Sequence, residues 1–213
     1  MERRLEILTY HEVSPDNPSI WSITPVLLRA HLTWLRDNGW RFVTLDEAVL
    51  EYAPAGKQVV ITFDDGRLGQ WDHAKPILDE FGIKATFYIC PQMTDGDAAE
   101  NQKYTDFMGW SQIYELCVEG HTIGNHGKCH DRMDEMKNIR LVTQISEAGD
   151  ELCEWLDGEG IDHFSPPHGS TSPAVVEMVR GLGYRTLVTT EDRGNPLPID
   201  PYNLGRRQIT AGT

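Results

Sequence analysis

At residues 59–66 the chain reads Val59-Val60-Ile61-Thr62-Phe63-Asp64-Asp65-Gly66. Apolar side chains occupy nearly every position up to Phe63, so both faces of this segment would be buried. Such a run is typical of a strand in a parallel sheet that has a core on one face and helices on the other. We therefore expect a strand over 58–63 in an α/β fold, with two adjacent carboxylates at its carboxyl end.

Short β-branched and aromatic runs alternate with amphipathic segments on both sides of this strand. Further strands are expected at 5–10, 41–44, 84–90, 121–125, 161–165, 184–189 and 204–209. One helix is predicted to begin at Thr24-Pro25 and to end at Asn38-Gly39, and others are expected at 45–52, 71–81, 110–119, 138–158 and 172–182. The alternation predicts a parallel sheet or an α/β barrel.

No linker rich in Ser, Gly or Pro interrupts this order, so we expect residues 1–213 to form a single domain. Residues 91–108 and 191–203 lack apolar periodicity or are rich in proline, and we expect them to be loops. In parallel α/β folds, chemistry is carried by loops that leave the carboxyl ends of the strands.

The bulk composition excludes several classes of protein. Of the 213 residues, 39% are hydrophobic and 24% are charged, as in an ordinary globular domain. The formal net charge of -14 argues against a broad basic surface for nucleic acid or for an anionic membrane, and it would repel an acidic polymer. A neutral or cationic substrate is expected.

The cysteines and the first residues bear on the cellular compartment. No C-x-x-C pair occurs among Cys90, Cys117, Cys129 and Cys153, so we expect free thiols, with disulfides as the alternative. No apolar signal region precedes the first strand, and no apolar run is long enough to cross a bilayer. We therefore expect a cytoplasmic protein, although a trimmed exported protein would look the same.

Two histidines point to a metal site. His126 and His130 are four residues apart, a spacing that would place both imidazoles on one side of a helical turn. With a carboxylate from elsewhere they could hold one divalent metal and leave a coordination position open for water, as in a catalytic zinc-type site. Taken alone, such a pair is more often surface decoration, and an isolated Asp-Asp-Gly is more often a turn.

Other polar residues are weaker candidates. His121 is expected to form a hydrogen bond within the core, and Cys129 is a poor candidate for a ligand. The prolines in Ser165-Pro166-Pro167-His168-Gly169 constrain the backbone, so an N–H could be presented to a developing oxyanion, although a rigid turn is the simpler interpretation. His11 ends the first strand and would face the same rim.

Taken together, these motifs resemble the polysaccharide deacetylases, the NodB-homology family (carbohydrate esterase family 4) that includes chitin, peptidoglycan and poly-N-acetylglucosamine deacetylases. The T-F-D-D-G, the H-x-x-x-H and the P-P-x-G occur in the family's order, and the resemblance covers nearly the whole chain. The resemblance implies a distorted (β/α) barrel. It also implies that Asp64 is the general base, that Asp65, His126 and His130 bind a divalent metal, and that a backbone N–H near Pro167-His168 stabilises the oxyanion. The metal would be Zn²⁺, with Co²⁺ or Ni²⁺ as alternatives.

The chain departs from the family pattern at three places. The usual C-terminal L-x-H, whose histidine is the general acid, is missing. One branch of the family is circularly permuted and includes poly-N-acetylglucosamine deacetylases. In that branch the histidine follows a tyrosine on the first strand. Tyr10-His11 matches, so His11 inherits the role. An arginine that orients the base often precedes the prolines, and Ser165 stands there instead. His168 replaces a frequent aromatic residue.

The resulting hypothesis is metal-assisted hydrolysis of a small N-acyl group, such as acetyl, on an amino sugar or glycan. The metal would activate water, Asp64 would accept its proton and protonated His11 would protonate the leaving nitrogen. A non-sugar linear amide is the alternative substrate on the same scaffold. An inactive glycan-binding protein and a structural metal domain are further alternatives, the latter usually having a closed, cysteine-rich ligand set.

Overall fold

The chain folds around a curled sheet of parallel strands. The computed structural model describes residues 4–16, 19–49, 56–94, 106–196 and 198–212. The strands in order across the sheet are β10 (Arg207–Gln208), β1 (Arg4–Tyr10), β5 (Lys57–Phe63), β6 (Thr86–Ile89), β7 (Thr122–Asn125), β8 (His163–Phe164) and β9 (Thr186–Leu187). β4 (Arg41–Phe42) pairs with the beginning of β5, and all these pairings are parallel.

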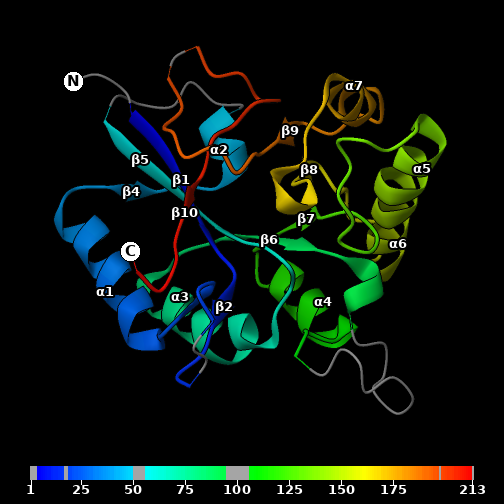
Figure 1. Ribbon diagram of the computed structural model, residues 1–213. Helices are drawn as coiled ribbons and strands as arrows, with labels where there is room; N and C mark the ends of the chain where they lie inside the picture. Colours follow the sequence, from blue (N-terminus) through cyan, green and yellow to red (C-terminus); the bar gives the residue numbers. More distant parts are fainter. Residues whose placement is uncertain (1–3, 17–18, 50–55, 95–105, 197, 213) are drawn as a thin grey trace.

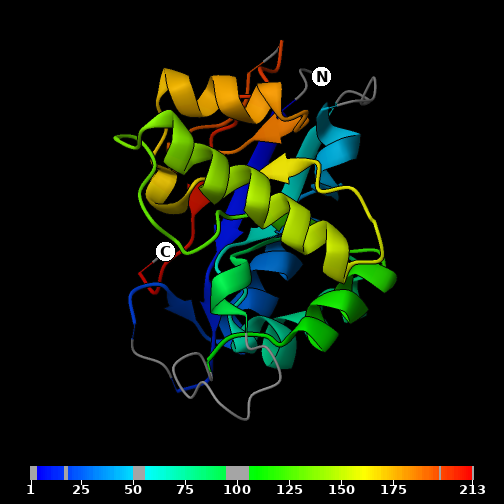
Figure 2. The ribbon, with the colours of Figure 1, turned by 90° about the vertical axis from the view of Figure 1, so that its right-hand side faces the viewer.

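Helices lie outside this sheet and cover it (Figures 1 and 2). They are α1 (Pro25–Asp37), α2 (Leu45–Val49), α3 (Lys75–Phe81), α4 (Trp110–Val118), α5 (Asn138–Val142), α6 (Ala148–Trp155) and α7 (Pro173–Gly181). Wider π turns at 70–74 and 143–147 run directly into α3 and α6.

The segment that follows β9 links the two edges of the sheet. The backbone N–H of Thr189 donates to the carbonyl of Leu204 over 2.7 Å, and Val188 forms a parallel bridge with Leu204. Three residues later the chain pairs with β1 as β10. The expected distorted (β/α) barrel is therefore confirmed, with its last gap bridged by this returning segment.

The strand and helix predictions hold closely within the described residues. Every expected strand is present, including the one expected at 204–209, although several are shorter; the small parallel pair β2 (Glu12–Val13) and β3 (Ser22–Ile23) was not predicted. Thr24 caps α1 by accepting from the backbone N–H of Leu27 over 3.2 Å, as its sequence indicates. The helix expected over 138–158 is divided by the π turn. Most of the loop expected at 91–108 lies outside the described residues.

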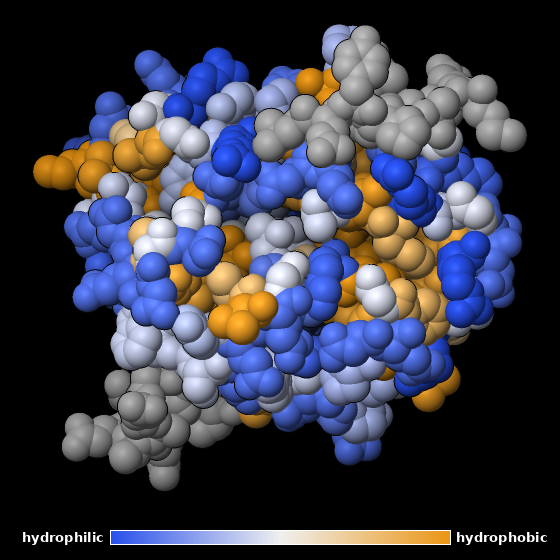
Figure 3. Space-filling model, turned by 180° about the vertical axis from the view of Figure 1, so that it is seen from behind, coloured by the Kyte–Doolittle hydropathy of each residue, from blue (hydrophilic) through white to orange (hydrophobic). Residues whose placement is uncertain are grey.

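The core is apolar on both sides of the central strand. Val59, Ile61 and Phe63 pack in one buried cluster, and Val60 packs in a second, so β5 is covered on both faces as its sequence predicts. Some large apolar side chains remain exposed, among them Trp34 of α1 and Trp155 of α6, and on the face shown in Figure 3 hydrophobic residues gather in patches bordered by hydrophilic ones. Across the described residues, no helix is both long and apolar enough to span a membrane.

Strand register brings the candidate residues to one rim. β1 and β5 pair from Arg4 opposite Lys57 to Tyr10 opposite Phe63, so the next residues on these strands, His11 and Asp64, leave the sheet side by side. In the same way, β7 and β8 pair at Asn125 and Phe164, and both strands end there. Residues that follow these strands are therefore neighbours, although they are far apart in the sequence.

Candidate metal centre

Asp65, His126 and His130 lie together at the carboxyl ends of the strands. One ligand atom from each lies within 4.8 Å of those of the other two. Oδ1 of Asp65 is 3.2 Å from Nε2 of His130 and 3.5 Å from Nε2 of His126. Zinc holds N and O ligands at about 2.0–2.2 Å, so two ligand atoms of a tetrahedral site are about 3.3–3.6 Å apart. These separations fit one shared cation.

The oxygen at the centre of this cluster lacks a hydrogen bond. Oδ1 of Asp65 is buried and accepts no hydrogen bond within the described structure, although two imidazole nitrogens are close. A buried carboxylate oxygen without a donor is costly. The ring nitrogens therefore face a point that they share with Oδ1, where a divalent cation would satisfy all three atoms.

A hydrogen bond to the backbone orients His126 for this role. Its Nδ1 lies 2.6 Å from the carbonyl oxygen of Ser165, which accepts the Nδ1–H and leaves Nε2 as the atom with the free lone pair. Such outer hydrogen bonds fix the tautomer of histidines that bind metals. Burial lowers the pKa of His126, but Asp64 and Asp65 outweigh burial and raise that pKa above its ordinary value. Binding of a metal at Nε2 would displace the proton that the raised pKa favours on that atom.

Left-handed backbone conformations position two of the three candidate ligands. Asp65 has φ 76° and His130 has φ 60°, values that non-glycine residues rarely adopt. Residues 126–130 form an irregular loop, so the helical turn expected from the His126–His130 spacing is wrong. The loop turns at Gly127, which has φ 76°, and brings the rings to 5.2 Å between centroids. Strained residues of this kind concentrate at functional sites.

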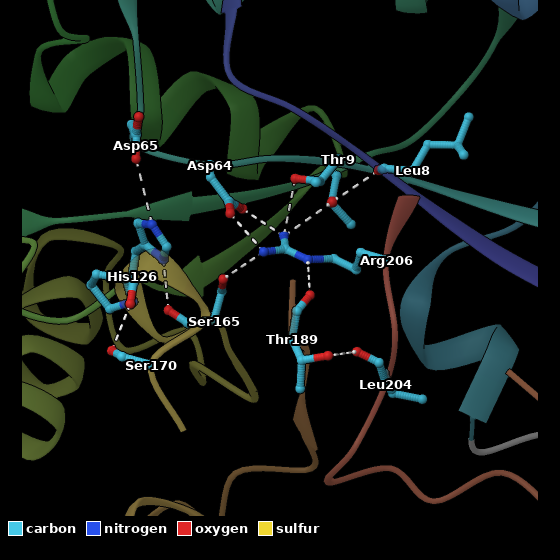
Figure 4. Close-up of polar contacts among 12 residues, drawn as sticks. Leu8, Thr9, Asp64, Asp65, His126, Ser165, Ser170, Thr189, Leu204 and Arg206 are labelled. Atoms are coloured by element: carbon cyan, nitrogen blue, oxygen red, sulfur yellow. Dashed lines mark hydrogen bonds and ion pairs between the residues drawn. The ribbon is translucent and has the colours of Figure 1, made fainter. Parts of the chain in front are cut away.

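Asp64 forms a buried ion pair that local sequence patterns did not reveal. Its two oxygens accept from Nη1 and Nη2 of Arg206, each over 2.7 Å (Figure 4). Arg206 is fully buried and Asp64 is 2% exposed. Burial raises the pKa of Asp64, but the charges of Arg206 and His126 outweigh it and hold that pKa below its ordinary value. Asp64 is therefore an anion beside the candidate metal site.

Arg206 is a functional candidate that the sequence reasoning missed. The only local signal was a charged residue two positions after Leu204, on what would be the inward face of a strand over 204–209. Ser165 stands where relatives often have an arginine, and its hydroxyl accepts from Nη2 of Arg206 over 3.1 Å. An arginine thus reaches the candidate base, but from another part of the chain.

His11 lies at the same rim, beneath a partly exposed tryptophan. Its ring centroid is 5.1 Å from that of Trp21, and its buried Nδ1 has no hydrogen-bond partner in the described structure. Burial lowers the pKa of His11, while Asp64 and Asp65 act in the opposite direction. This ring is close enough to both carboxylates for their charges to act on it.

The segment with two prolines forms a tight turn beside the ligands. The backbone N–H groups of Gly169 and Ser170 donate to the carbonyl oxygens of Pro166 and Pro167. The N–H of His168 makes no such hydrogen bond within this turn. His168 has φ 58°, and its ring meets that of His130 edge-on, with 4.6 Å between centroids. The turn is therefore placed where its N–H and its imidazole could contact a substrate.

The weaker candidates do not belong to the cluster of Asp65, His126 and His130. His121 precedes β7, and its Nδ1 accepts the backbone N–H of Ala85 over 3.1 Å, in agreement with the expected core role. Cys129 contacts Gln144 and Asp131. All four cysteines are described and none forms a disulfide, in agreement with the expectation of free thiols.

Comparisons with known proteins agree with this architecture. The family model described as polysaccharide deacetylase matches residues 51–187. YxkH of Bacillus subtilis (strain 168) is 28% identical over 215 residues, covering 98% of this chain and 72% of that protein. The poly-beta-1,6-N-acetyl-D-glucosamine N-deacetylase of Escherichia coli (strain K12) is 27% identical over 228 residues, covering 86% of this chain but only 33% of that protein.

A solved structure shows the same fold. The Streptococcus pyogenes deacetylase PplD in complex with acetate superposes with a TM-score of 0.85 at 23% identity, covering 99% of this chain and 94% of that one.

Proposed function

Since the chain belongs to the polysaccharide deacetylase family, we propose that it is a metal-dependent hydrolase that removes an N-acetyl or similar small acyl group from an amino sugar or glycan. The observation that carries this proposal is the convergence of Asp65, His126 and His130 on one point beside the buried anion Asp64. Three protein ligands leave a fourth position for water or substrate, as in catalytic rather than structural zinc sites.

The residues around this point divide the work of amide hydrolysis. A divalent cation, Zn²⁺ or alternatively Co²⁺ or Ni²⁺, would supply Lewis acidity, which polarises an acyl oxygen and lowers the pKa of water. Asp64 accepts the proton of the attacking water at a carboxylate oxygen. His11 delivers a proton to the leaving nitrogen, because an amide anion is too poor a leaving group. The backbone N–H of His168 would donate to the oxyanion that develops on the acyl oxygen.

Three observations support a neutral amino sugar as the substrate class. The E. coli relative is named for action on poly-beta-1,6-N-acetyl-D-glucosamine, and we propose a neutral N-acetylated glycan of this kind here. Trp21 is 41% exposed and lies against His11, where it could stack on the sugar that carries the leaving nitrogen. The net charge of -14 favours neutral over acidic glycans.

A mass-spectrometric screen tests the proposal. Protein loaded with Zn²⁺ is incubated with N-acetylated monosaccharides, oligosaccharides, sugar nucleotides and non-sugar linear amides, and His126→Ala protein serves as the matched control. We expect a mass loss of one acetyl group from the sugars with the wild type only. Release only from non-sugar amides would refute the substrate class, and a metal-loaded wild type without any acyl release would refute the activity.

A further inference from the structure

A buried side-chain amide joins the two strands that carry the proposed acid and base. Gln70 begins the π turn at 70–74 and is fully buried. Its Nε2 donates to the carbonyl oxygen of His11 over 2.7 Å and to that of Asp64 over 2.6 Å. A glutamine amide has two N–H donors, so each carbonyl takes one. The amide therefore links the residues that directly follow β1 and β5.

These two hydrogen bonds lie just beyond the last pair of residues in the sheet. The register of β1 and β5 ends with Tyr10 opposite Phe63, and the N–H of Asp64 donates to the carbonyl of Tyr10 over 3.0 Å. The carbonyls of His11 and Asp64 come after this bond. Buried backbone carbonyls need a donor, and Gln70 supplies one to each. The side chain thus fixes the spacing of the two strand ends where their pairing stops.

The local sequence brings Gln70 into this position. Gly69 lies against β2, because a Cβ at this residue would collide with the side chain of Glu12 and with the carbonyl of Val13. Only glycine allows the chain to approach so closely. The N–H of Gln70 donates to the carbonyl of Arg67 over 3.0 Å, and the wide π turn begins there. Single π turns are frequent at functional sites.

Asp64 and His11 depend on this amide to different degrees. The carboxylate of Asp64 is also held by the buried guanidinium of Arg206. That guanidinium donates further to Thr9, Ser165 and Thr189. The ring of His11, in contrast, lies against Trp21, and its buried Nδ1 has no hydrogen-bond partner in the described structure. Loss of the Gln70 amide would therefore displace His11 more than Asp64.

We infer that Gln70 is a positioning residue that holds His11 at a fixed distance from Asp64. The inference rests on the proposed function, because it concerns the proton donor of that reaction. Gln70 is fully buried and acts through the backbone of His11. In amide hydrolysis the donor must reach the leaving nitrogen while the base faces the attacking water. The gap between the two groups therefore has to match the substrate, and small displacements are costly.

A purely structural role is the competing explanation, in which Gln70 only supplies donors to two carbonyls. Its own Oε1 is buried and accepts no hydrogen bond within the described structure, which costs free energy. Replacing a structural residue would lower thermal stability and would affect all substrates equally. Replacing a residue that positions the acid affects an amide far more than an aryl ester, because only the amide needs a proton on its leaving group.

The test compares Gln70→Met, which removes both donors at nearly the same volume, with Gln58→Met as the matched control. Gln58 is a buried residue at the other end of β5. Each zinc-loaded protein is assayed with an oligosaccharide of beta-1,6-linked N-acetylglucosamine and with an aryl acetate, and its zinc content and Tm are measured.

The ratio of the two rates is the decisive result. We expect kcat of Gln70→Met to fall about 10²-fold on the oligosaccharide and far less on the aryl acetate, while KM and bound zinc change little. Gln58→Met should keep the wild-type ratio even if its Tm falls. Gln70→Asn keeps both donors on a shorter side chain and should retain more of the oligosaccharide rate than Gln70→Met. If Gln70→Met does not fold, the ratio in Gln70→Asn decides the question.

A wild-type ratio in the folded Gln70 variants, or equal losses of kcat and bound zinc, would overturn the inference. A zinc-loaded wild type that releases acetate from no N-acetylated sugar would instead refute the proposed function, and the inference would fall with it.

Discussion

Replacing a carboxylate by an amide at Asp64 or at Asp65 should distinguish the roles of these two neighbouring residues. In Asp64→Asn, the amide can accept from only one arm of Arg206 and presents a donor to the other. The guanidinium then lies fully buried without its counter-charge. Removing one partner of a buried ion pair costs about 3–5 kcal/mol. Since Thr9, Ser165 and Thr189 still accept from Arg206, we expect the lower end of that range.

That loss is large enough to measure by heating. For a chain of 150–250 residues, 1 kcal/mol shifts Tm by about 2–4 °C, so a loss of about 3 kcal/mol corresponds to a fall of about 6–12 °C. Asp65→Asn is the matched control. Its nearest non-histidine cation, Arg67, is 3.7 Å away and partly exposed, so its fall in metal-free protein should be less than half as large.

The loss of zinc should rank the two variants in the opposite order to the fall in Tm. Asp64→Asn removes a proton acceptor and should keep zinc while losing nearly all turnover. Asp65→Asn removes a ligand and should lose zinc. Thermal unfolding followed by circular dichroism, with and without zinc, gives both results, because a metal present at 100 times its Kd stabilises the native state by about 2.7 kcal/mol.

Two outcomes would refute this reasoning. If Asp64→Asn lost zinc while Asp65→Asn kept it, the roles of base and ligand would be inverted. If the two metal-free variants unfolded at the same temperature, the pair between Asp64 and Arg206 would not have the energetic importance that its burial implies.

Three further predictions concern the ligands, the acid and a core histidine. Alanine at Asp65, His126 or His130 should each remove bound zinc in elemental analysis, and unchanged zinc in all three would eliminate the site. His11→Ala should slow hydrolysis of ordinary amides about 10²–10⁴-fold but activated aryl esters far less, with metal retained; equal losses would assign His11 to binding or packing. Burial lowers the pKa of His121 from 6.5 to about 4. Between these pH values the unfolded chain binds a proton that the folded chain does not. The free energy of unfolding should therefore fall by up to about 3 kcal/mol as pH drops from about 6.5 to 4. His121→Gln should flatten this dependence in urea titrations, and an unchanged slope would contradict it.

Local sequence patterns were sufficient to predict most elements of the fold and to predict which polar residues lie together at the strand ends. The apolar run that ends at Phe63 predicted a strand buried on both faces, and β5 is covered on both faces. Placement at the strand ends predicted that His11 and Asp64 would share a rim, and the register of β1 and β5 brings them together. These predictions succeed because side-chain periodicity and the direction of parallel strands are local properties of the chain.

The tertiary structure alone determined how the site is held. The His126–His130 spacing suggested a helical turn, but a loop with left-handed residues brings the rings together, because a four-residue spacing does not specify a backbone path. The partner of Asp64 could not be identified from any motif, since Arg206 lies 142 residues away and reaches Asp64 only when β10 pairs with β1. An ion pair between distant segments leaves no periodic signal in either one. The pair forms only when barrel closure brings the two side chains together in the buried interior. There each charge is stabilised by the other.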